Sequence, residues 1–121
     1  MDFSYDCKQT ISADRWALVG EAGRFSDPLY SPGSDLIGIY NTLIVSAVQT
    51  NDPARLAATC EFAELIQQIM YEAYIPSYAE TYDCLGDQEA YTLKYSWELT
   101  VYFGFFVLPM INGLFANAEF M

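Results

Sequence analysis

The sequence contains no histidine and few basic residues. Its 121 residues include 5 Lys and Arg against 16 Asp and Glu, which gives a formal net charge of -11. The lack of histidine excludes the Ser-His-Asp and Cys-His nucleophile systems and every metal site built on imidazole. The scarcity of Lys and Arg argues against nucleic acid and anionic membrane surfaces as partners, because both need clustered positive charge.

Cysteine is also scarce, and its spacing indicates neither a disulfide framework nor a metal site. Cys7, Cys60 and Cys84 are odd in number, irregularly spaced and without a CxxC pair, so neither a disulfide set nor a zinc site is expected. The N-terminal residues lack the basic and apolar blocks of a signal peptide. We therefore expect free, mostly buried thiols, no metal and a cytoplasmic protein.

Flexible linkers, repeats and low-complexity segments are absent as well. Hydrophobic residues make up 53% of the chain and include 10 Tyr, 8 Phe and 2 Trp, which is the composition of a folded chain. The length suits one domain, or a fragment of a larger one, covering residues 1–121. We expect a mainly α fold in which short N-terminal strands precede three to four packed helices.

The strands are expected near the N-terminus. Residues 1–15 alternate weakly between apolar and polar side chains, and residues 12–15 have the composition of a turn. The apolar run at 16–19 lacks alternation, which is typical of a strand buried on both faces.

The first helix is expected over about residues 34–50, because apolar side chains recur there at three- and four-residue spacing. Ser34 or Asp35 can cap it. Asn41 lies on this helix, where a hydrogen bond to a neighbouring loop is favoured over contact with a ligand. The second helix should begin at Pro53, the first helical position after a capping residue.

Pro76 is expected to stop or kink the second helix, which should continue to about Tyr74. A third helix is predicted over residues 88–108 with Asp87 as its cap, and a short helix within residues 110–121. The run from Leu99 to Phe115 carries no charge, yet it is too short for a membrane span and is interrupted by glycine and proline. A buried helix of a larger protein explains this run better.

Four tyrosines follow helical spacing around Pro76, and they are Tyr71, Tyr74, Tyr78 and Tyr82. With Trp97 they are candidates for the wall of a pocket for a planar substrate. Packing in a core or interface is the favoured interpretation.

The most informative stretch is residues 16–41, where a short strand, a turn with small residues, a loop stiffened by prolines and a helix start follow one another. Gly20 and Gly23 permit close approach of another molecule to the backbone. Glu21 offers a carboxylate suited to hydroxyl donors. Gly33 and Ser34 place unpaired N–H groups at the start of the helix, where electron-rich groups bind.

The sequence Gly20-Glu21-Ala22, followed by Asp27-Pro28-Leu29 and by Ser31-x-Gly33, resembles the second flavin motif of FAD-dependent monooxygenases. The flavin-dependent halogenases and geranylgeranyl-reductase-like oxidoreductases are the most similar members. The resemblance implies that FAD is the cofactor and that the chain forms the C-terminal part of an α/β FAD-binding fold.

The resemblance also implies roles for individual residues. Gly20, Glu21, Asp27, Pro28, Gly33 and Ser34 would be the cofactor-binding set. Glu21 would hold the ribityl chain, Pro28 would lie against the isoalloxazine ring, and the backbone from residue 31 to Ser34 would approach the pyrimidine side. The catalytic residues stay unassigned.

Two positions depart from the pattern. Glu21 replaces the usual aspartate but keeps the acceptor. Pro32 has no N–H, so halide binding through that backbone group is not available. This favours an oxidoreductase that does not halogenate.

A GxGxxG turn for the ADP half of FAD is missing, as is the tryptophan-rich signature of halogenases. We therefore expect a fragment that functions with an N-terminal FAD-binding portion, with residues 51–121 on the side of a small organic substrate, aromatic or carrier-bound. Two alternatives remain. One is a non-enzymatic acidic helical domain that packs on a partner through an aromatic surface. The other is a small membrane-associated protein built on residues 96–115.

Overall fold

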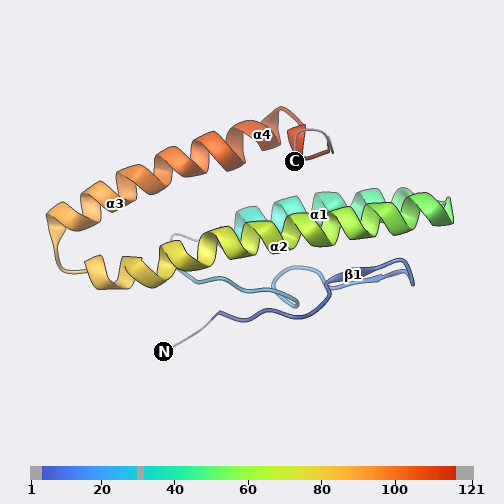
Figure 1. Cartoon of the computed structure of the whole chain (residues 1–121), viewed down its shortest axis with the longest axis horizontal. Coiled ribbons are helices and arrows are strands. Elements are labelled where there is room, and N and C mark those ends of the chain that lie inside the picture. Colours follow the sequence, from blue (N-terminus) through green and yellow to red (C-terminus); the bar gives the residue numbers. More distant parts are fainter. Residues whose placement is uncertain (1–3, 30–31, 117–121) are drawn as a thin grey trace. The chain divides into compact units, whose positions relative to one another are not determined.

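The computed structural model describes residues 4–29 and 32–116, and it is mainly helical, as the sequence predicts. The elements are β1 (Ile11–Ser12), β2 (Trp16–Ala17), α1 (Pro32–Gln49), α2 (Pro53–Cys84), α3 (Gln88–Val101), the π-helical η1 (Tyr102–Val107), α4 (Leu108–Ile111) and the 3₁₀ turn η2 (Leu114–Ala116) (Figure 1). They form two compact units, Met1–Tyr78 and Ala79–Met121, which we describe separately.

The two strands form a small antiparallel hairpin in the first unit. Ile11 lies opposite Ala17 and Ser12 lies opposite Trp16. The connecting turn contains Arg15, whose φ of 64° is left-handed, and the Arg15 N–H donates to the Ser12 carbonyl at 3.1 Å. The turn predicted at residues 12–15 is therefore confirmed.

The apolar run at 16–19 is less buried than the sequence predicts. Trp16 is 43% exposed and Val19 is 59% exposed, so the expectation of a strand buried on both faces is wrong for this structure. In the weakly alternating segment before β1, Tyr5 forms an isolated bridge with Phe25, and both backbone hydrogen bonds are 3.0 Å long. Phe3, which the alternation would place on the same face as Tyr5, lies outside the described residues.

Helix α1 begins at Pro32, two residues before the predicted start, with proline at a position that needs no N–H donor. Ser34 and Asp35 therefore lie within its first turn and not at its cap, and the acidic Asp35 is favourable there because of the helix dipole.

Helix α2 begins where the sequence predicts, and the Asp52 carboxylate accepts from the Arg55 N–H at 2.8 Å. The prediction that the helix ends near Tyr74 is wrong, because α2 continues through Pro76 to Cys84. The rings of Tyr74 and Tyr78 stack at 5.8 Å, and Tyr78 is buried. Proline has no N–H, so the helix lacks one backbone hydrogen bond at Pro76.

The core of the first unit joins the hairpin to α1 and α2. Its buried members are Ile11, Ile44, Ala47, Leu56, Cys60 and Ala63. Five of them lie on the helix positions where apolar residues recur, which is why the spacing predicts the helices well. Burial raises the pKa of the Cys60 thiol, so this cysteine is a packing residue.

The second unit starts from the end of α2. Asp87 caps α3 by accepting from the N–H groups of Glu89 and Ala90, which confirms the predicted start. Lys94 contacts Glu98 and the Thr81 hydroxyl. No side chain of α3 is buried.

The third helix does not stay α-helical to residue 108. From Tyr102 to Val107 it is a π-helix, and the Leu108 N–H donates to the Phe103 carbonyl five residues back. The short helix predicted within residues 110–121 is described only in part. Helix α4 ends at Ile111 and η2 follows it, while residues 117–121 lie outside the described part. None of the helices within the described ranges has the length and apolarity needed to cross a membrane.

Candidate functional site

The loop between β2 and α1 begins with a tight turn at Gly20. Its φ of 64° is left-handed, a conformation that side chains disfavour. Across this turn the Ala22 N–H donates to the Val19 carbonyl at 3.3 Å. A Cβ at Gly20 would meet nothing within 4 Å, so the space beside it is open. The open space is compatible with the expectation for Gly20, and the approach of a ligand there stays a prediction.

Glu21 follows this turn and reaches the start of α1. A Cβ built on Gly33 would lie 2.6 Å from the Oε1 atom of Glu21. The Tyr5 hydroxyl donates to the Glu21 carbonyl at 2.6 Å and holds its backbone. The carboxylate is favoured at this position by the positive end of the helix dipole. The fold therefore brings together two residues of the predicted cofactor-binding set that are distant in the sequence.

Gly23 packs against other parts of the chain and does not have the ligand-contacting role that the sequence predicts. A Cβ there would lie 2.7 Å from Cγ2 of Thr10, and 3.3 Å from both Sγ of Cys7 and Cδ1 of Leu18. The missing side chain thus makes room for the chain itself. The expectation that Gly23 admits another molecule is wrong.

Asp27, Pro28 and Ser34 occupy different surroundings. Asp27 is buried, and its Oδ1 atom accepts from the Leu29 N–H at 2.8 Å, which stabilises the turn that leads toward α1. Pro28 and Ser34 are exposed, the first in the loop and the second on the first turn of α1.

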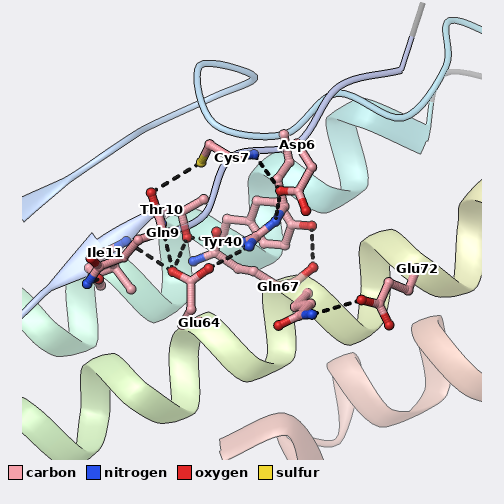
Figure 2. A network of polar contacts seen from close by, with 11 residues as sticks. Asp6, Cys7, Gln9, Thr10, Ile11, Tyr40, Glu64, Gln67 and Glu72 are labelled. Atoms are coloured by element: carbon pink, nitrogen blue, oxygen red, sulfur yellow. Dashed lines mark hydrogen bonds and ion pairs between the residues drawn. The ribbon is translucent and has the colours of Figure 1, made fainter. Parts of the chain in front are cut away.

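An ionic network joins Arg24 of the loop to Asp6 and Glu64, two residues that Figure 2 labels. Arg24 is 6% exposed, and it places Nη2 at 2.5 Å from Oε1 of Glu64 and Nε at 2.6 Å from Oδ1 of Asp6. Glu64 extends from α2 toward the start of β1. Its Oε2 atom accepts from the N–H and the hydroxyl of Thr10, both at 2.7 Å, and from the Ile11 N–H at 3.2 Å.

Burial and pairing oppose each other at this network. Burial pushes the pKa of Glu64 upward, but the hydrogen bonds from Thr10 and the nearby Arg24 lower the pKa below its ordinary value. Burial likewise opposes the charge of Arg24, while Glu64 and Asp6 raise the pKa of the guanidinium above its ordinary value. Both groups are therefore charged at neutral pH.

Sequence reasoning missed this network, although two signals for it exist. Arg24 is one of only 5 basic residues, and it lies inside a loop of small and apolar residues. Glu64 falls one helical turn after Cys60, on the face of α2 that packs into the core. A charged residue on such a face needs a partner, but the sequence does not say which.

Tyr40 links the two long helices of the first unit. It is buried, and its hydroxyl donates to the Gln67 carbonyl at 3.0 Å, which Figure 2 also shows. Burial raises its pKa, so the phenol stays neutral. The adjacent Asn41 is exposed.

The aromatic residues proposed as a pocket wall do not share one environment. Tyr71 and Tyr78 are buried, and Tyr74 stacks on Tyr78, which agrees with the packing role favoured from the sequence. Tyr82 is 45% exposed, and Trp97 on α3 is 64% exposed.

Comparison of the chain with protein-family models, with curated proteins and with solved structures gives no match. Within residues 4–29 and 32–116, no three His, Cys, Asp or Glu side chains gather as they would around a metal ion.

Proposed function

We propose that the chain is the flavin-positioning portion of an FAD-dependent oxidoreductase, similar to the monooxygenases and halogenases. The observation that carries this proposal is the position of the Glu21 carboxylate beside Gly33, at the start of α1. The second flavin motif places an acidic residue and a helix start against the same cofactor. The open side of Gly20 is compatible with a ligand that lies along the backbone there.

The residues present fit the ribityl chain and the ring of FAD. Glu21 accepts hydrogen bonds from ribityl hydroxyls, and the N–H groups of Gly33 and Ser34 at the start of α1 attract electron-rich atoms of the ring. Pro28, exposed in the loop, supplies a rigid apolar contact. FAD, when bound, supplies the redox chemistry, and the protein supplies position and electrostatics.

The proposal includes partners outside these residues. The ADP half of FAD needs a GxGxxG unit, which the chain lacks, so an N-terminal FAD-binding portion completes the site. The substrate is a small organic molecule, aromatic or carrier-bound, on the side of residues 51–121. Pro32 lacks the N–H for a halide contact, which favours hydroxylation or reduction over halogenation. The free cysteines fit a cytoplasmic location.

A titration of the ¹⁵N-labelled chain with FMN tests the proposal. FMN carries the ring and ribityl chain without the ADP half, and nuclear magnetic resonance detects weak binding. We expect shifts at the amides of Gly20, Glu21, Gly33 and Ser34, with a Kd of about 1 mM or tighter. The variant Glu21→Ala should weaken binding, whereas Glu61→Ala, at an exposed position on α2, should not.

The flavin proposal would be overturned if saturating FMN left these amides unshifted. It would also be overturned if Glu21→Ala and Glu61→Ala bound FMN equally well. ADP, which has neither the isoalloxazine ring nor the ribityl chain, should give no shifts at the start of α1.

A second candidate function is an interaction domain that packs on a partner through aromatic residues. The observation in its favour is the exposure of apolar side chains near the C-terminal end of the described chain. Phe103 is 54%, Phe105 is 71% and Ile111 is 72% exposed. Exposed apolar side chains mark an interaction surface where they form a contiguous patch. Sedimentation analysis that finds Phe105→Ser changes an assembly state would support this function.

A further inference from the structure

We propose that Arg24 and Glu64 are positioning residues, which fix the loop that carries Glu21 and thereby set flavin affinity through Glu21. This inference rests on the proposed function, because Glu21 is the residue that would contact the cofactor. Neither Arg24 nor Glu64 belongs to the flavin motif, and neither is placed against the cofactor.

The loop is anchored to the rest of the unit close to Glu21. Glu21 itself is exposed, and three residues later the side chain of Arg24 is buried. Arg24 reaches Asp6 in the N-terminal segment and Glu64 on α2. The loop therefore cannot move away from α2 without separating a buried charge from its partners.

A single carboxylate holds two segments in register. Oε1 of Glu64 pairs with Arg24 of the loop, while Oε2 accepts from Thr10 and Ile11 at the start of β1. The guanidinium closes the network, since Nη1 of Arg24 donates to the Thr10 hydroxyl at 3.2 Å. Gly23 rests against Thr10, so a shift of β1 would displace the loop as well.

Tyr5 adds a second connection at the same loop. Its hydroxyl donates to the Glu21 carbonyl, and its backbone pairs with Phe25. Arg24 lies between these two attachments and binds Asp6, the residue after Tyr5. The N-terminal segment and the loop are thus joined at Glu21, Arg24 and Phe25.

An ion pair suits this task better than an apolar contact. Its net contribution to stability is small, but its hydrogen bonds are directional, so they fix one arrangement of the groups they join. An apolar pair would permit the loop to slide. Loss of the Glu64 charge leaves the buried Arg24 with Asp6 as its remaining ionic partner, and the loop loses its ionic attachment to α2.

Two measurements on the full chain test this inference. The first is hydrogen exchange of the amides at 18–29, followed by mass spectrometry, with residues 36–49 of α1 as the internal reference. In Glu64→Gln we expect faster exchange in the loop and an unchanged rate in α1. Glu61→Gln and Arg55→Met, at exposed positions on α2, should leave both rates unchanged.

The second measurement is the FMN titration, at a temperature where circular dichroism shows each variant to be folded. Glu64→Gln should weaken FMN binding by about tenfold, a coupling typical of residues in one network. Because Glu64 acts through Glu21, the double variant Glu21→Ala, Glu64→Gln should bind no more weakly than Glu21→Ala alone. A loss from general loosening would instead add to that of Glu21→Ala.

The outcomes separate the two proposals. Unchanged loop exchange in Glu64→Gln overturns the positioning role whether or not FMN binds. Additive losses in the double variant overturn it as well. Faster loop exchange in a chain that binds no FMN refutes the flavin proposal and the link to affinity, but retains the anchoring of the loop. If Glu64→Gln does not fold, Arg24→Lys keeps the charge, loses the forked guanidinium and gives the same readouts.

Discussion

Gly23 and Thr10 are in such close contact that a Cβ at Gly23 would lie 2.7 Å from Cγ2 of Thr10. Gly23→Ala should therefore destabilise the first unit by about 1 to 3 kcal/mol, the usual cost of overpacking a well-filled site. Urea unfolding followed by circular dichroism measures this loss. Thr10→Ser removes the methyl group and keeps the hydroxyl that bonds Glu64, so in the Gly23→Ala background it should restore part of the lost stability. An equal loss in the single and double variants would contradict this explanation.

Gly33 is close to the flexible end of a side chain, so its substitution should affect binding more than stability. In Gly33→Ala the new methyl group displaces the Glu21 carboxylate, which can swing away at little cost. We expect FMN affinity to fall by about threefold to tenfold. Gly38→Ala is the matched control on α1, because a Cβ there meets nothing within 4 Å. It should raise helix stability by about 0.5 to 1 kcal/mol and leave FMN binding unchanged.

The Glu64 carboxylate should make the chain acid-sensitive in a specific way. Its pKa is lowered in the folded state, so its contribution is complete above about pH 4.3, the ordinary unfolded value, and is lost as the pH falls through the folded pKa. At pH 7 we expect Glu64→Gln to reduce the free energy of unfolding by about 2 to 3 kcal/mol. Urea unfolding between pH 7 and about pH 2 should show the two chains converging at acid pH. Parallel curves would contradict the assigned pairing, and Glu61→Gln is the exposed control.

Adjacent residues on α2 should differ sharply in their tolerance of truncation. Ile66 is 0% exposed, whereas Leu65 is 52% exposed. Ile66→Ala should cost about 2 to 5 kcal/mol of stability, and Leu65→Ala should cost less than about 0.5 kcal/mol beyond its change in helix propensity. Thermal unfolding of the two variants checks this difference. Similar losses would mean that the packed face of α2 is assigned incorrectly.

The sequence predicts the helices well because their apolar spacing is a local signal. Leu36 and Ile44 on α1, and Leu56 and Ala63 on α2, are buried where the three- and four-residue spacing places them. The capping role of Asp87 is local too, and it is confirmed. The change to π-helix at Tyr102 has no such pattern, since it depends on how one turn of backbone is accommodated.

Part of the candidate site depends on contacts between residues that are distant in the sequence, which local patterns do not predict. Glu21 and Gly33, which the sequence assigns to one motif, lie close together in the structure, while the flavin role of that motif stays a prediction. The pairing of Arg24 with Glu64 joins residues 40 positions apart, and composition alone cannot specify it. The use of Gly23 depends in the same way on Thr10, the residue before β1.

Pro76 gives a last test, since the sequence predicts that the second helix ends or kinks there and the structure continues α2 through it. Pro76 is exposed inside α2, so it removes a backbone hydrogen bond to the Glu72 carbonyl without contributing core packing. Pro76→Ala should therefore stabilise the chain by about 1 to 3 kcal/mol, as measured by urea unfolding. Pro53→Ala is the matched control, because proline at the first helical position costs no hydrogen bond and its replacement should have little effect. If Pro76→Ala destabilised the chain, the proline would be needed to shape the helix, and the packing of Tyr74 on Tyr78 would depend on that shape.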